Sequence, residues 1–141
     1  MSEYFNEGQR QLQENFETVP LADRLQAGII AAEINPLDAE FIEAQNMFFL
    51  ATVDDKGQAN CSYKGGSKGL VKVVDSTTLA FPIYDGNGMF MSAGNVLVNG
   101  QVGLLFVDFN KQARVRVNGL ARITENDPLL SHWPEIGRAH V

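Results

Sequence analysis

The sequence contains very little cysteine and histidine. Among its 141 residues there is one cysteine, Cys61, and there are two histidines, His132 and His140. A single cysteine excludes an internal disulfide and fits a reducing compartment, so we expect a cytoplasmic protein. One cysteine and two histidines also fall short of a Cys/His zinc site, and we predict no metal site.

Positive charge and long apolar runs are scarce as well. Eleven basic residues against seventeen acidic residues give a net charge of −6. Nucleic-acid binding depends on a basic field that neutralises phosphates, so we expect no nucleic-acid partner. No apolar run approaches the roughly 20 residues of a membrane-spanning helix, and the acidic, polar start MSEYFNEGQRQLQENFE is unlike a secretory signal. We expect no membrane partner.

Common catalytic motifs are missing too. The sequence has no GxGxxG loop, no Walker loop, no nucleophile elbow and no HExxH. We therefore name no catalytic residue. Apolar residues make up 45% of the chain, which is enough for a hydrophobic core and argues against global disorder.

The first 45 residues have the spacing of helices. Asn35-Pro36-Leu37-Asp38 combines a cap residue, a proline and an acid in the first turn, which predicts a short helix to about Ala44. Before it, apolar residues recur at spacings of four and seven along two helical faces: Phe5, Leu12 and Phe16, then Leu21, Leu25 and Ile29 after Pro20.

From Met47 onward the pattern changes to that of strands. Short turns and the lack of a βαβ rhythm favour a small antiparallel barrel, whose closure removes exposed edges. We expect a mostly β protein with one domain over 1–141, a helical arm over 1–45 and a barrel over 46–141. The chain ends while 138–141 begins another strand, so we expect a truncated barrel that lacks a strand unless another chain supplies it. The predicted strands are 47–53, 58–64, 70–75, 78–83, 101–109 and 113–124, with one helix inserted at 89–100.

Two loops have the composition of anion sites. In SYKGGSKG, Lys64 and Lys68 lie beside glycines whose N–H groups are accessible, a combination that suits a phosphate. The alternative is a flexible solvated loop. In YDGNGMFMSAGN, a helix that begins near Met89 would direct unpaired N–H groups at the preceding loop, with Asn87 and Ser92 as further donors. The alternative there is a capped helix after a tight turn.

Two arginines and one tryptophan complete the candidates. Arg114 and Arg116 share one face of the last strand, opposite Val115 and Val117, and either contact a ligand or line the solvent side. Trp133 beside His132 is interpreted as packing under a loop.

Taken in order, these segments resemble the pyridoxamine 5′-phosphate oxidase-like family of FMN-binding split barrels. The resemblance covers roughly 36–124 and depends on FIEAQNMFFLATVDDKGQANCSYKGG, GNGMFMSAGNVLVNGQVGLLF and RVRVNGLARI. It implies a six-stranded antiparallel split barrel, a homodimer and FMN at the dimer interface. The implied phosphate site is Ser62, Lys64 and 87–92. With the neighbouring loop and strand positions, the candidate cofactor-binding residues are Ser62, Tyr63, Lys64, Gly65, Tyr84, Asn87, Ser92, Asn95, Arg114 and Arg116.

The chain departs from this family at the start of the inserted helix. Many members carry arginine, or Ser-Arg-Lys, where this chain reads GMFMS, with Met89 and Met91. A charge-assisted contact to phosphate is worth roughly 1.5–3 kcal/mol. Lys64, Lys68 or an arginine would have to supply that charge here.

Three hypotheses about function follow. The first is a homodimeric FMN-binding oxidoreductase-like protein of unidentified substrate, in which flavin performs the redox chemistry. We do not expect pyridoxamine phosphate oxidation itself, because the sequence has no second arginine-rich phosphate site. The second is a non-catalytic flavin or small-ligand binding module. The third is a structural dimer domain that has lost its cofactor.

Overall fold

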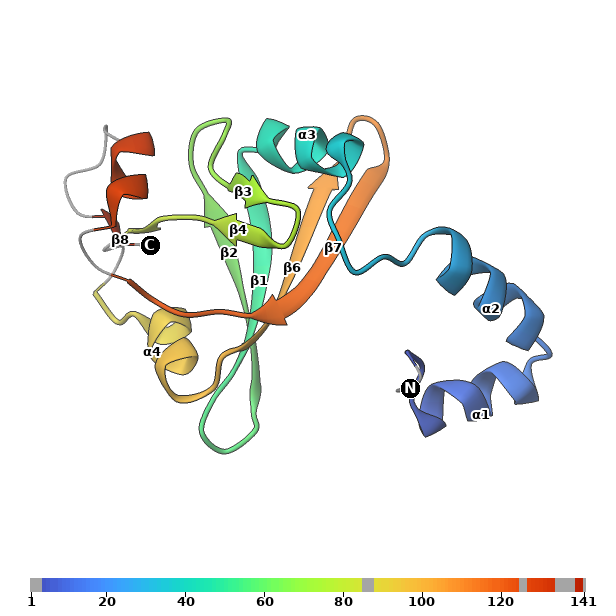
Figure 1. Cartoon of the computed structure of the whole chain (residues 1–141). Helices are drawn as coiled ribbons and strands as arrows, with labels where there is room; N and C mark the ends of the chain where they lie inside the picture. Colours follow the sequence, from blue (N-terminus) through green and yellow to red (C-terminus); the bar gives the residue numbers. More distant parts are fainter. Residues whose placement is uncertain (1–3, 85–87, 125–126, 134–138, 141) are drawn as a thin grey trace. The chain divides into compact units, whose positions relative to one another are not determined.

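The computed structural model describes residues 4–84, 88–124, 127–133 and 139–140 (Figure 1). Contacts within the chain divide it into two compact units, Met1–Ile34 and Asn35–Val141. None of the described helices is long and apolar enough to cross a membrane.

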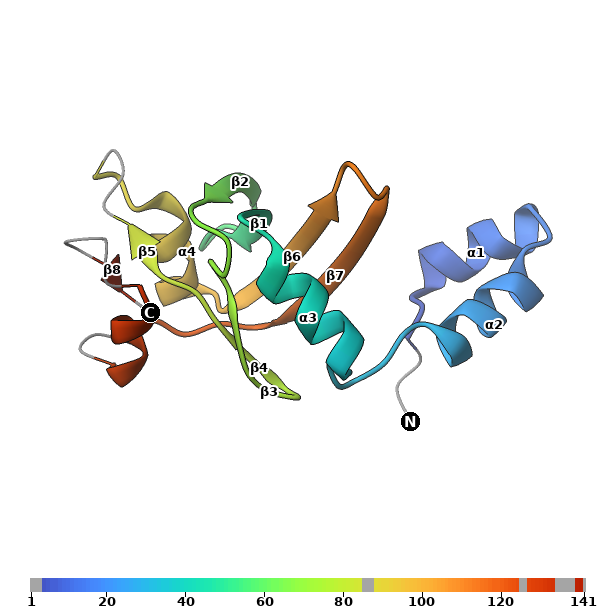
Figure 2. The same cartoon turned by 90° about the horizontal axis from the view of Figure 1, so that it is seen from above.

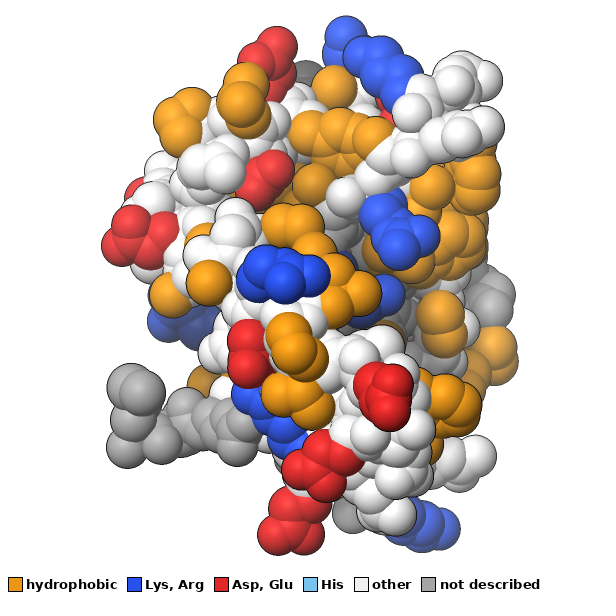
Figure 3. Space-filling view, turned by 90° about the vertical axis from the view of Figure 1, so that its right-hand side faces the viewer, with side chains coloured by type: hydrophobic (Ala, Val, Ile, Leu, Met, Phe, Trp, Pro, Cys, Tyr) orange, Lys and Arg blue, Asp and Glu red, His pale blue; other side chains and the backbone are white. Residues whose placement is uncertain are grey.

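The first unit is a pair of helices, α1 (Glu7–Asn15) and α2 (Val19–Gly28). Asn6 begins α1 with a capping box, in which Asn6 and Gln9 each accept the other's backbone N–H at 2.8 Å. An ion pair between Arg10 and Asp23, at 2.8 Å, joins the two helices. Within these two helices only Ala22 is buried, so most apolar side chains of the pair are exposed. Figure 3 shows such exposed hydrophobic side chains among charged ones.

The second unit begins with α3 (Pro36–Ala44), which starts as predicted. The side chain of Asn35 accepts the backbone N–H of Asp38 at 2.8 Å. Ile42 is fully buried, and Glu43 accepts the backbone N–H of Val73 at 3.2 Å. By its contacts α3 therefore belongs with the strands rather than with the arm in which we placed it, while the organisation as one domain stays a prediction.

The Asn35 cap predicts a measurable loss of stability when it is removed. Asn35→Ala leaves the N–H of Asp38 without its acceptor, and we expect the free energy of unfolding to fall by about 1 kcal/mol. Denaturant unfolding followed by circular dichroism measures this change. Asn110→Ala, in the exposed turn at 109–112, is the control and should change stability by less than about 0.5 kcal/mol. Equal effects of the two variants would contradict the assigned cap.

The strands are antiparallel throughout, as expected for a mostly β protein. The main sheet has the order β2-β1-β6-β7 and is formed by β1 (Met47–Val53), β2 (Ala59–Gly65), β6 (Gln101–Asp108) and β7 (Ala113–Leu120). Two smaller pairs are β3 (Lys72–Asp75) with β4 (Thr78–Ala80), and β5 (Ile83–Tyr84) with β8 (Ala139–His140). Across the described residues these eight strands form three separate sheets (Figures 1 and 2), so closure into a six-stranded barrel stays a prediction.

The core lies on one face of the main sheet. Phe48, Leu50 and Thr52 of β1 alternate with exposed or half-buried residues, and the strand pairing places Leu104 of β6 beside Leu50. The ring of Phe48 contacts those of Phe81 and Phe106, at centroid distances of 4.9 and 5.4 Å. We call the face of the sheet that carries Phe48, Leu50 and Thr52 the inner face.

The other elements are the inserted helix and a short helical turn. The inserted helix α4 spans Met91–Val98, close to the prediction of 89–100, and it packs against β1. After the 3-10 helix η1 (Pro128–His132), the buried Trp133 donates its indole N–H to the carbonyl of Leu70 at 3.0 Å. The predicted packing of Trp133 is therefore confirmed.

Candidate functional site

Two predicted ligand-binding residues lie on the inner face of strand β2. The pairing sets Ser62 opposite Leu50 and Lys64 opposite Phe48, so both side chains point to the side of the core. Because β2 is an edge strand, Ser62 and Lys64 are half-buried instead of fully enclosed. A polar pair at the rim of the core is therefore accessible to a ligand.

Helix α4 is held to the sheet by polar side chains. The hydroxyls of Ser62 and Ser92 are hydrogen-bonded at 2.9 Å, and the side-chain amide of Asn95 donates to the hydroxyl of Thr52 at 3.0 Å. Ser92 and Thr52 are both buried. These bonds hold α4 in one position against β1 and β2.

The same two bonds set the direction of α4. On β2, Asn60 is paired with Thr52, and Ser62 lies between Asn60 and Lys64. Asn95 meets the sheet at Thr52, and Ser92, which precedes it on the helix, meets the sheet at Ser62. The start of α4 is therefore directed toward the Lys64 end of β2.

Among the described residues, no side chain caps the start of α4. The residue before it, Phe90, has φ 51° and ψ 41°, a left-handed conformation that costs roughly 1–2 kcal/mol for a residue with a side chain. Phe90 makes no side-chain capping bond. Uncapped N–H groups and the helix dipole both favour an anion at this end of the helix.

Lys64 carries a positive charge at the end of β2 toward which the start of α4 is directed. Among the described residues no acidic group forms an ion pair with Lys64. Burial lowers the pKa of the Lys64 amine below its ordinary value of 10.5, because desolvation disfavours the charged form. An anion bound here would supply the missing counter-charge.

Sequence comparison connects this arrangement with a known family. The family model for pyridoxamine 5′-phosphate oxidase matches residues 34–139, which is most of the chain. The chain belongs to the pyridoxamine 5′-phosphate oxidase family. The resemblance inferred from the sequence is thus confirmed, whereas no curated protein matches the chain.

Solved structures support the fold of this oxidase family. A pyridoxamine 5′-phosphate oxidase candidate from Lactobacillus delbrueckii is similar at 22% identity and a TM-score of 0.61, over 79% of this chain and 88% of its own. HupZ from Group A Streptococcus is similar at 25% identity and a TM-score of 0.57, over 72% of this chain and 75% of its own. HutZ, the heme storage protein from Vibrio cholerae, is similar at 24% identity and a TM-score of 0.50, over 73% of this chain and 70% of its own.

The predicted site residues do not all come together. Ser62, Lys64, Ser92 and Asn95 lie along the contact between β2, β1 and α4. Tyr84 lies in β5, and Asn87 lies outside the described residues.

Four predicted residues lie on the outer face of the sheet, opposite the core. Tyr63 and Gly65 alternate with Ser62 and Lys64, and a Cβ on Gly65 would stand only 2.6 Å from the Tyr63 hydroxyl. Arg114 and Arg116 are exposed on β7, opposite Val107 and Leu105 of β6. Lys64 therefore lies on one edge strand and on the inner face, whereas the two arginines lie on the other edge strand and on the outer face.

Two residues of the candidate site, Thr52 and Phe90, were not predicted from the sequence. Thr52 was placed in an apolar strand without a role, yet its hydroxyl holds Asn95. Its alternation with Phe48 and Leu50 was the available signal, because it places a hydroxyl on the buried face. The left-handed backbone of Phe90 had no signal, since aromatic residues seldom adopt that conformation.

The inner-face residues Lys64, Ser62 and Ser92 share one chemical property, since each carries a hydrogen-bond donor. One amine, two hydroxyls and the first N–H groups of α4 all supply hydrogen-bond donors, which match the oxygens of a dianion. Across the described residues no group of three or more His, Cys, Asp or Glu side chains is placed to hold a metal ion. The described side chains here are thus hydrogen-bond donors and not a cluster of metal ligands.

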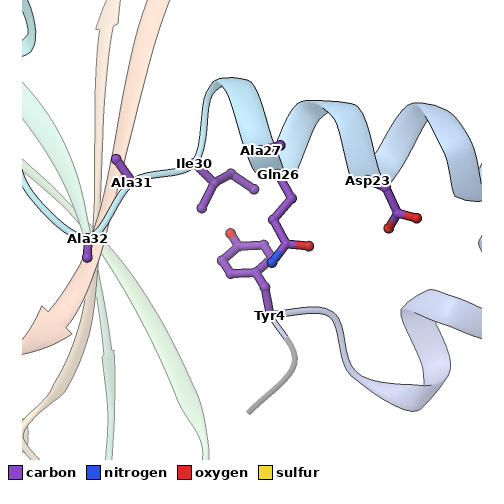
Figure 4. A pocket seen from close by; sticks show the side chains of 7 residues that line it. All are labelled: Tyr4, Asp23, Gln26, Ala27, Ile30, Ala31 and Ala32. Carbon is purple, nitrogen blue, oxygen red and sulfur yellow. The ribbon is translucent and has the colours of Figure 1, made fainter. Parts of the chain in front are cut away.

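A hollow lies in the first unit, beside α2 (Figure 4). The ring of Tyr4 lies near Gln26 and Ile30 in the view of Figure 4. Asp23 is the one charged residue of the hollow, and Arg10 already pairs with it. Such a lining offers a phosphate no positive charge. The hollow is lined by Tyr4, Asp23, Gln26, Ala27, Ile30, Ala31 and Ala32.

Proposed function

We propose that this protein binds FMN and acts as a flavin-dependent oxidoreductase on a substrate still to be identified. The observation that carries the proposal is the half-buried Lys64, which lacks an ion-pair partner among the described residues and lies toward the uncapped start of α4. Ser62 and Ser92 add hydroxyls beside it. Membership of the pyridoxamine 5′-phosphate oxidase family supports the choice of FMN as the phosphate-bearing group.

The residues of this chain would bind and orient the cofactor. When bound, FMN supplies the redox chemistry. Lys64 holds the charge of the phosphate, and the hydroxyls of Ser62 and Ser92 exchange their mutual hydrogen bond for bonds to phosphate oxygens. Asn95 keeps α4 in place through Thr52, so the helix start stays directed at the phosphate.

We further propose a homodimer of six-stranded split barrels with the flavin at the interface. Arg114 and Arg116 would contact such a flavin only from the second copy, since they lie on the far edge and the outer face. The outer face also carries the half-buried apolar residues Phe49 and Leu105, which are paired with each other and are suited to association. An exposed, unpaired Cys61 on the same face suits a reducing compartment such as the cytoplasm.

Two other hypotheses, a non-catalytic flavin module and a heme-binding protein, make different predictions. A non-catalytic flavin module uses the same phosphate site but needs no electron donor. HutZ is a heme storage protein, and heme is usually held by an axial side chain such as histidine. Of the described side chains only His132 is an imidazole; it is exposed and lies in η1, not on the inner-face strands. The donor set at Lys64 therefore favours FMN.

Titration of the cofactor-free protein with FMN tests the proposed function. We expect quenching of flavin fluorescence that saturates at one FMN per chain, and bleaching of the bound flavin by NADH or NADPH. Binding without reduction by any donor would leave the flavin-module hypothesis. No flavin binding would leave the structural-domain hypothesis. Tight binding of hemin without FMN binding would contradict the proposal in favour of heme.

A further inference from the structure

The hollow beside α2 in the first unit, which we call the α2 hollow, has a volume of about 580 Å³. This volume lies within the range of about 300–1,000 Å³ that is typical of ligand pockets. Alanine and isoleucine side chains form most of its wall, and Tyr4, Asp23 and Gln26 contribute the polar groups (Figure 4). The α2 hollow is therefore a candidate binding site apart from the inner-face site.

The polar groups of the α2 hollow suit a cation. The hydroxyl of Tyr4 and the side-chain amide of Gln26 each carry an oxygen that accepts hydrogen bonds. Arg10 pairs with Oδ1 of Asp23, and the Asp23 side chain is 53% exposed, so its carboxylate can accept further donors. Gln26 also lies in the last turn of α2, where the helix dipole favours positive charge and no basic residue is present.

The first unit has few positive charges of its own. Residues 1–34 contain six acidic and two basic residues, a net charge of −4, whereas the whole chain has a net charge of −6. Of the two bases, Arg10 pairs with Asp23, donates to the side-chain oxygen of Gln13 at 2.9 Å and lies over the ring of Phe5. Most of the net charge of the chain therefore belongs to the unit that contains the α2 hollow.

Further carboxylates of this unit are exposed. Glu7 and Glu14 are seven positions apart on α1, so they share one face of that helix. Glu33 follows Ala32, a residue of the hollow's wall. Within the part of the chain that the structure describes, none of these three glutamates forms an ion pair. A ligand with several positive charges can therefore be balanced by several carboxylates.

The weakness of single surface contacts favours a basic peptide segment over a small amine. One exposed ion pair changes affinity by about fivefold or less, so an alkylamine held by Asp23 alone would bind poorly. Lysine and arginine also have aliphatic stems that lie along apolar surface while the charged group stays in water, and the alanine wall offers such a surface. A second copy of this chain is a poorer occupant, because it brings a net charge of −6.

A bound segment would add contacts that the first unit lacks. Helices α1 and α2 have 9 and 10 residues, whereas isolated helices shorter than about 12–15 residues are marginal in water. Within these two helices only Ala22 is buried. The pair therefore has little core of its own, and a partner that covers part of its surface should stabilise it.

We propose that the α2 hollow is a docking site for a lysine- or arginine-rich segment of another protein. One basic side chain of the segment lies along the alanine wall with its charged group at Asp23, and the other positive charges are balanced by the glutamates of the first unit. The proposal concerns the first unit alone, so it does not depend on FMN binding near Lys64.

Fluorescence anisotropy of a labelled octalysine peptide, titrated with the full cofactor-free chain, tests this docking site. Ala27→Lys places an amine in the hollow, one helical turn from Asp23, where it competes for the carboxylate. We expect the dissociation constant of octalysine to rise by about tenfold or more. Ala27→Glu should lower it by about threefold. Because Ala27 is exposed and both new residues favour helices, the fold should be retained.

The matched control is Asn15→Lys on α1. Asn15 is exposed, is not part of the hollow's wall, and has no acidic residue three or four positions away. The control adds the same charge to the first unit, and we expect it to raise the dissociation constant by less than about threefold. Equal weakening by Ala27→Lys and Asn15→Lys would show only the general attraction of an acidic surface and would overturn the docking site.

The remaining outcomes are also decisive. Failure of octalysine to bind overturns the proposal. Spermidine that binds as tightly as octalysine would assign the hollow to a small polyamine instead of a protein segment. If sedimentation shows that Ala27→Lys changes only self-association, a second copy covers the hollow and the proposal is wrong. Should Ala27→Lys fail to fold by circular dichroism, Ala27→Glu decides alone. None of these results depends on the FMN titration, so the two proposals can fail separately.

Discussion

We expect FMN to bind this protein more tightly than riboflavin by about 10–100-fold, which corresponds to about 1.4–2.8 kcal/mol. The two molecules share the isoalloxazine ring and differ in the phosphate. The donors of the inner-face site, namely Lys64, Ser62, Ser92 and the start of α4, are all suited to that phosphate. A charge-assisted hydrogen bond is worth roughly 1.5–3 kcal/mol, so one well-placed amine accounts for most of the difference.

Calorimetry with both ligands at low and moderate salt measures this preference. Because Lys64 is half-buried, its contact with phosphate should be screened less by salt than an exposed ion pair. Equal affinities for FMN and riboflavin would show that the inner-face site does not hold phosphate. A preference that disappears entirely at moderate salt would assign the phosphate to exposed cations such as Lys68 instead.

Much of the fold could be predicted from local signals. Asn35-Pro36 marked the start of α3 because cap chemistry is local, and the Met47–Val53 strand was bounded correctly by its apolar run and the following turn. The short strand β5 could not be predicted, since two residues carry no periodicity and its partner β8 lies more than fifty positions later. Pairing over such a separation depends on tertiary contacts that no local pattern contains.

The candidate site shows the same division between local and non-local information. The resemblance grouped Ser62 and Lys64 in one implied phosphate site, and the pairing of β2 with β1 sets both on the inner face. The alternation along β7 placed Arg114 and Arg116 on one face of that strand. It could not say which face of the sheet this would be. Their pairing with Val107 and Leu105 decides it, because Leu104 and Phe106 occupy the inner face. Face assignment therefore required the register between strands.

Replacement of Lys64 by methionine should have opposite effects on binding and on stability. Lys64→Met keeps an apolar chain of similar length but removes the charge, and we expect FMN affinity to fall by about 10–100-fold. Without ligand, the half-buried charge has no counter-ion among the described residues, and its partial desolvation opposes folding. The cofactor-free variant should therefore unfold at a higher temperature than the wild type at neutral pH.

The pH dependence provides the sharpest check on this role of Lys64. Burial lowers the pKa of the folded-state amine below 10.5, so between the lowered value and 10.5 the unfolded chain binds more protons. In the cofactor-free wild type, stability should rise with pH across this window, and FMN affinity should fall as the amine loses its proton. Lys64→Met should show neither change, while Lys68→Met, at an exposed lysine, should retain both. Calorimetric titrations and thermal melts from neutral to alkaline pH measure the two quantities, and a wild-type profile that matches Lys64→Met would remove Lys64 from the phosphate site.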